Sequence, residues 1–98
     1  MIRHIALLQL ADTTTNEQRT LIIEKLQGLP AVVPEIISYS VGLNAGSAEG
    51  NSSVAVVGDF EDMASYEAYA SNQDHLDVIA TYIKPHATGR AGIQYDLG

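Results

Sequence analysis

The stretch I-R-H-I-A-L-L-Q-L at Ile2–Leu10 decides the fold, because apolar residues occupy both of its alternating sides. One side carries Ile5 and Leu7. The other side carries Ile2, His4, Ala6, Leu8 and Leu10. A strand that is apolar on both sides lies inside a sheet and is covered on both faces. The His4 ring must therefore find a hydrogen-bond partner or line a cavity.

Composition limits the classes of molecule that this chain is expected to bind. Its 98 residues are expected to form one domain, residues 1–98, with a small core that self-association would supplement. The net charge is −7, and the five basic residues are spread singly, so neither nucleic acid nor a membrane surface is an expected partner. We interpret the opening as a strand rather than a signal peptide, and we expect a cytoplasmic protein.

The first helix is expected at Asn16–Gln27, where leucines and isoleucines recur at helical spacing. A capping box can form from Thr14 with Glu17 or from Thr15 with Gln18. At the other end, Gly28 fits the residue after the helix, and a proline follows two residues later.

Three further strands follow from the spacing of apolar residues. Residues 36–43 and 90–97 alternate between apolar and polar, which is typical of strands at the edge of a sheet. Val54–Phe60 is apolar on both sides and is expected to be central. Residues 44–53, rich in Gly, Ser and Asn, are expected to form a loop.

A second helical region lies between the last two strands. Asp62 can cap a helix that runs through Tyr66 and Tyr69, and residues 71–74 interrupt it. Asp74 can cap a second segment over residues 75–84, which ends before a proline.

The order of these elements, strand-helix-strand-strand-helix-strand, predicts a ferredoxin-like α+β fold with sheet order 4-1-3-2. Two helices cover one face of such a sheet, and the other face would expose a large apolar patch. A second copy packed sheet to sheet is the simplest cover, so we expect a homodimer. We expect the His4 side to face the space between the two sheets.

Three segments resemble the stress-responsive A/B barrel (Dabb) family: M-I-R-H-I at 1–5, G-D-F-E-D at 58–62 and Y-A-S-N-Q-D-H at 69–75. The resemblance implies a ferredoxin-like unit that dimerises into an α/β barrel. The family includes a heat-stable plant protein that assembles into rings. It also includes a plant olivetolic acid cyclase, which closes a polyketide by an aldol reaction without a cofactor, using a histidine base and a tyrosine.

By this resemblance, His75 and Tyr69 correspond to the catalytic histidine and tyrosine, and His4 to a further active-site histidine. We add Tyr66, three residues before Tyr69, as a candidate ligand contact. Each of these residues could instead serve packing or capping alone. The three histidines lack the spacing of metal ligands, so no metal is expected. The resemblance to a cofactor-free cyclase implies no cofactor either.

Three functions stay open at this stage. The first is an apolar cavity that binds a small hydrophobic molecule. The second is cofactor-free aldol or Claisen-type cyclisation, with His75 as base and Tyr69 as partner. The third is a stress-linked assembly protein without a ligand.

Overall fold

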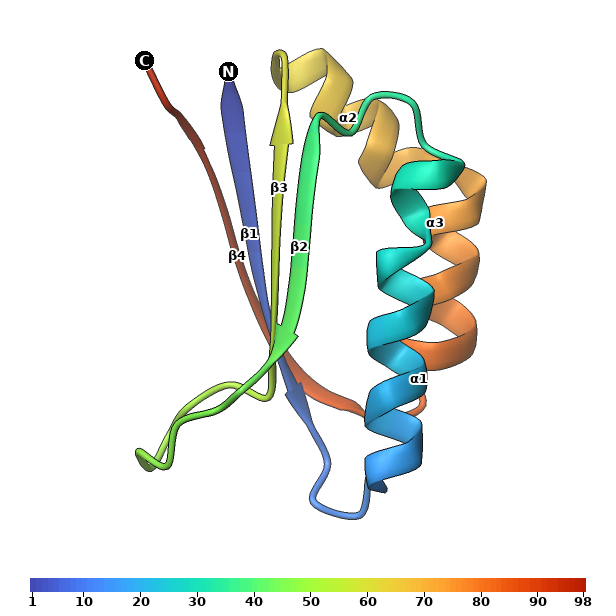
Figure 1. The fold of residues 1–98 in the computed structure, drawn as a ribbon, viewed down its shortest axis with the longest axis vertical. Coiled ribbons are helices and arrows are strands. Elements are labelled where there is room, and N and C mark those ends of the chain that lie inside the picture. Colours follow the sequence, from blue (N-terminus) through green and yellow to red (C-terminus); the bar gives the residue numbers. More distant parts are fainter.

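The computed structural model describes all residues, 1–98, as one sheet and one layer of helices (Figure 1). The sheet consists of β1 (Ile2–Leu10), β2 (Ser38–Leu43), β3 (Val54–Phe60) and β4 (Ala87–Asp96). The helical layer consists of α1 (Asn16–Gln27), a short 3-10 helix (Leu29–Ala31), α2 (Met63–Ser71), α3 (Gln73–Val78) and a π-helical turn (Ile79–Ile83). This arrangement is the predicted α+β unit.

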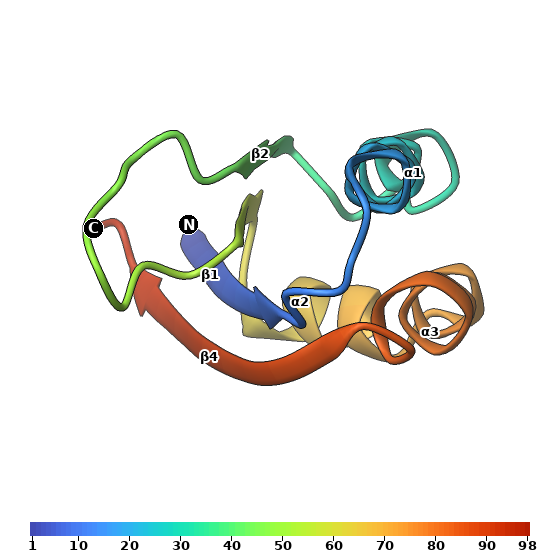
Figure 2. The same ribbon diagram turned by 90° about the horizontal axis from the view of Figure 1, so that it is seen from below.

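The strands pair antiparallel in the order β2-β3-β1-β4, which confirms the predicted ferredoxin-like fold. The central strand β1 lies between β3 and β4, with His4 opposite Gly58 on one side and Gln94 on the other. Figure 2 shows that the helices all lie to one side of the sheet. No helix of the same chain covers the opposite face of the sheet, as the order of strands and helices in the sequence predicted.

Several element boundaries differ from the predicted ones. Of the two possible capping boxes, Thr15 with Gln18 is the one that forms. Gly28 ends α1 in a right-handed conformation, with φ −76°, and is not a left-handed residue after the helix. The second strand begins at Ser38 rather than at residue 36. The fourth begins at Ala87 rather than at residue 90, because its pairing with β1 continues past a register shift near Leu10.

The helix that carries His75 begins earlier than predicted, and Asp74 is not its cap. The side chain of Asn72 accepts hydrogen bonds from the backbone amides of Asp74 and His75. The amide side chain of Asn72 is therefore the cap, and α3 begins at Gln73. As a result, His75 lies within the first turn of the helix.

The core lies between the sheet and the helices, and His4 belongs to it. Alternate residues of β1 are buried on this side: His4, Ala6, Leu8 and Leu10. Phe60 from β3 and Tyr69 from α2 complete the packing and are almost wholly buried. The expectation that His4 faces the uncovered side of the sheet is therefore wrong. Both sides of β1 are apolar, and the helices cover the side that carries the histidine.

The uncovered face combines an apolar stripe with one polar cluster. Leu7, Ile93 and Tyr95 are 37%, 56% and 41% exposed there, although all three are large hydrophobic side chains. At one end of the stripe, Arg3 donates two hydrogen bonds to the Asp59 carboxylate, at 2.8 and 2.9 Å, and Ser38 donates another at 2.8 Å. The charges on this face are thus already paired within one chain.

Gly58 provides a test of how closely the core is packed. A Cβ added there would lie 3.1 Å from both the Phe60 and Tyr39 rings, whereas one at Gly89 meets only Gln9, at 3.7 Å. We expect Gly58→Ala to lower the free energy of unfolding by about 1–3 kcal/mol through overpacking. Gly89→Ala should change it little. Urea denaturation of both variants measures the difference, and equal stabilities would contradict the packing described here.

Candidate functional site

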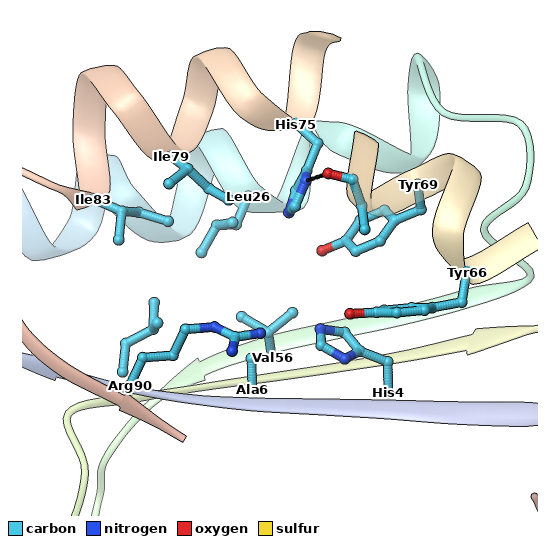
Figure 3. Close-up of a pocket in the computed structure, with 12 residues that line it drawn as sticks. His4, Ala6, Leu26, Val56, Tyr66, Tyr69, His75, Ile79, Ile83 and Arg90 are labelled. Atoms are coloured by element: carbon cyan, nitrogen blue, oxygen red, sulfur yellow. Dashed lines mark hydrogen bonds between the residues drawn. The ribbon is translucent and has the colours of Figure 1, made fainter. Parts of the chain in front are cut away.

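A largely apolar cavity of about 210 Å³ lies between β1 and the α2–α3 region. Aliphatic side chains of β1, β3, α1 and the π-helical turn form most of its wall. Five residues contribute polar groups: His4, Tyr66, Tyr69, His75 and Arg90. Figure 3 shows His75 pointing into the cavity from the helices and His4 from the sheet, with the two tyrosine hydroxyls between them.

His4 is held as a neutral ring that donates from one nitrogen. It is 3% exposed, and the Gln94 side-chain amide donates to its Nδ1 at 2.9 Å. Because Nδ1 accepts this bond, the proton of the neutral ring lies on Nε2. Burial, together with smaller contributions from the positive charges of Arg90 and of protonated His75, lowers the pKa of His4 to about 4. At neutral pH, His4 offers the cavity an N–H donor.

His75 is held in the opposite tautomer. Its Nδ1 lies 3.1 Å from the backbone carbonyl of Ala70, which can only accept, so Nδ1 carries the proton. Nε2 is left with a free lone pair. Burial lowers the pKa of His75; the bond to Ala70 opposes this effect, and the charge of Arg90 adds to it. His75 is therefore a neutral ring with an available proton acceptor.

The two tyrosines differ in how free their hydroxyls are. The Tyr69 hydroxyl shares a 2.8 Å hydrogen bond with that of Tyr39, and its ring lies 4.2 Å from the His75 ring, centroid to centroid. Burial raises the pKa of Tyr69, so the phenol stays protonated. Tyr66 packs 4.8 Å from His4, and its hydroxyl forms no hydrogen bond with the protein. Tyr66 is thus the freer donor.

The structure brings all four predicted site residues, His4, Tyr66, Tyr69 and His75, to one cavity. The sequence interpretation missed Arg90, Gln94 and Tyr39. A signal for the first two was present, since Arg90 and Gln94 alternate with the apolar residues of the last strand. Antiparallel pairing with β1 then puts Gln94 beside His4.

No group of three or more His, Asp or Glu side chains lies close enough together to hold a metal ion. No helix of the structure combines the length and the apolar character needed to cross a bilayer.

The sequence profile of the stress responsive A/B barrel domain (Dabb) matches residues 2–96. The chain belongs to this family. No curated protein shows significant similarity to it.

Solved structures extend the comparison. A dimeric ferredoxin-like protein of unknown function from Thermobifida fusca is 38% identical, with a TM-score of 0.88; the match covers 98% of this chain and 90% of that one. A dimeric protein of unknown function from Bacteroides fragilis is 24% identical, with a TM-score of 0.78 and coverages of 97% and 94%. Hydroxynitrile lyase from Passiflora edulis is 18% identical, with a TM-score of 0.84 and coverages of 99% and 93%. The last two show the shared fold alone.

The lowered pKa of His4 makes stability depend on pH. Between pH 6.5 and about 4 the unfolded chain binds a proton at His4 and the folded chain does not, so stability decreases as the pH falls through this range. We expect a loss of up to about 3 kcal/mol, which His4→Gln should remove. Denaturation at several pH values measures it, with His86→Gln, outside the cavity, as control. In NMR, a His4 titration midpoint near 6.5 would contradict the assignment.

Proposed function

We propose that this Dabb protein is a homodimer whose cavity binds a small, largely apolar carbonyl compound, and that His75 removes a proton from it without a cofactor. The observation that supports this most directly is the pair of opposite tautomers. His75 presents a proton acceptor to the cavity, and His4 presents a donor across from it. The acidic composition disfavours nucleic-acid and membrane partners, and we also expect a cytoplasmic protein.

The proposed step is a proton transfer. The His75 Nε2 lone pair takes a proton from a carbon next to the carbonyl, and the C–H electrons move to form an enolate whose charge lies on the carbonyl oxygen. Donors aimed at that oxygen lower the barrier. The free Tyr66 hydroxyl and the His4 Nε2–H are the groups available for this role. Tyr69 can join them when Tyr39 donates the hydrogen bond that the two phenols share.

The size of the cavity favours a compact substrate. Its 210 Å³ lies below the range of about 300–1,000 Å³ of most ligand sites. A long poly-β-keto chain would need the cavity to widen. The proposal therefore keeps the base and donor roles of a cyclase-like enzyme and assigns them to a smaller molecule.

The dimer is supported by the uncovered face of the sheet. Three large apolar side chains, Leu7, Ile93 and Tyr95, are exposed together on this face, which is typical of an interaction surface. The Arg3–Asp59 pair beside them is already satisfied. Such a face can be buried by a second copy without isolating a charge. The similar proteins from Thermobifida fusca and Bacteroides fragilis are described as dimeric.

Hydrogen–deuterium exchange of a neutral ketone tests the proton transfer. We expect the protein to accelerate exchange of the benzylic protons of phenylacetone in D₂O, followed by NMR. His75→Ala should reduce the acceleration by about 100-fold, because the base is lost. His86→Ala is the matched control and should leave it unchanged. Equal acceleration by wild type and His75→Ala, or binding without exchange, would refute the assignment of His75 as base.

Light scattering tests the dimer. We expect the wild-type chain to have twice its single-chain mass of 10.5 kDa, and Ile93→Glu to have the single-chain mass, because a carboxylate would be buried without a partner. Leu76→Glu places the same charge on α3, where the leucine is 44% exposed, and should stay dimeric. A wild-type monomer, or a dimeric Ile93→Glu variant, would contradict this interface; a larger wild-type mass would favour the assembly hypothesis.

A further inference from the structure

We infer that Arg90 makes this cavity selective for an anionic ligand, a compact and otherwise apolar oxo-acid whose carboxylate pairs with the guanidinium. The inference rests on the proposed function and specifies its substrate class.

The Arg90 guanidinium has no partner within the chain. The chain has 12 acidic residues, yet the ion pairs are Arg3 with Asp59 and the N-terminal amine with Asp96. Arg90 donates none of the hydrogen bonds formed by side chains. An arginine offers a planar set of N–H donors that matches a carboxylate with two parallel bonds. No group of the chain accepts from these donors, and the exposed Arg90 side chain leaves them open to a ligand.

The backbone directs this side chain into the cavity. Arg90 lies opposite Leu8, and the next residue on the same face of β4 is Gly92, opposite Ala6. The guanidinium lies over Gly92, because a Cβ there would be 2.9 Å from Nη1 and 3.0 Å from Nη2. Figure 3 shows the side chain extended along the cavity floor toward His4. The absence of a side chain at Gly92 thus gives the guanidinium its place.

The charge balance of the cavity points to an anion. His4 and His75 are neutral at pH 7 because burial lowers their pKa values, and Tyr69 remains a neutral phenol. Arg90 therefore adds a positive charge with no acidic residue among the cavity-lining residues to balance it. A carboxylate bound to the Arg90 guanidinium would lie on the side of the cavity floor that faces His4, whose Nε2–H can also donate to it.

Two probes that differ in one group separate charge recognition from apolar binding. Phenylpyruvate has a carboxylate where phenylacetone has a methyl group, and both contain the same benzylic carbon beside a carbonyl. We expect wild-type protein to bind phenylpyruvate more tightly than phenylacetone, with the difference decreasing as salt is added. Titration calorimetry or NMR gives both dissociation constants.

Variants of the strand identify the cause. Arg90→Met keeps an unbranched apolar stem and removes the guanidinium, and it should weaken phenylpyruvate binding by about 10- to 100-fold, with little effect on phenylacetone. Gly92→Ala should act in the same direction, because the new Cβ displaces the flexible end of Arg90 rather than backbone. Arg19→Met, on α1 and outside the cavity, is the matched control. Thermal unfolding verifies that each variant is folded.

The outcomes separate the two proposals. If phenylacetone binds as tightly as phenylpyruvate, or if Arg90→Met weakens both equally, the anion selectivity is refuted and the proposed function stands. If neither probe binds to wild-type protein, both the proposed function and this inference fail.

Discussion

The whole site depends on the register with which β1 pairs with its two neighbours. Because side chains alternate along a strand, a shift of one residue would move His4 from the helix-covered face to the uncovered one. The observed register puts Gln94 beside His4 and Arg90 opposite Leu8, on the same face. The hydrogen bond that selects the His4 tautomer and the cation on the cavity floor therefore come from one strand pairing.

The order of the elements follows from local signals that the sequence contains. The strand Val54–Phe60 and the helix Asn16–Gln27 have the predicted bounds, because their apolar spacing and the Thr15 cap are properties of neighbouring residues. The sheet order could also be predicted, since only two strands are apolar on both sides and must be central. The family resemblance identified His75 and Tyr69 as candidate site residues, and both line the cavity.

The side on which His4 lies could not be predicted in this way. Both sides of β1 are apolar, so either could have met the helices, and burial alone does not distinguish them. Gln94 and Arg90 were missed for a related reason. They are isolated polar residues in an edge strand, and their meaning depends on which residues of β1 they face, which is a property of the assembled sheet.

The break between α2 and α3 explains how two histidines in one cavity can have opposite roles. The last carbonyls of a helix have no partner within it, and Ala70 lies one residue before the end of α2. Asn72 follows α2 directly and caps the start of α3, so the chain turns within one residue. This turn brings His75 within reach of the Ala70 carbonyl. This bond removes Nδ1 as an acceptor and leaves Nε2 facing the cavity. On the sheet, the Gln94 amide donates to Nδ1 of His4, so the proton of that ring lies on Nε2. The difference between base and donor therefore arises from the hydrogen-bond partner of each ring, while burial keeps both rings neutral.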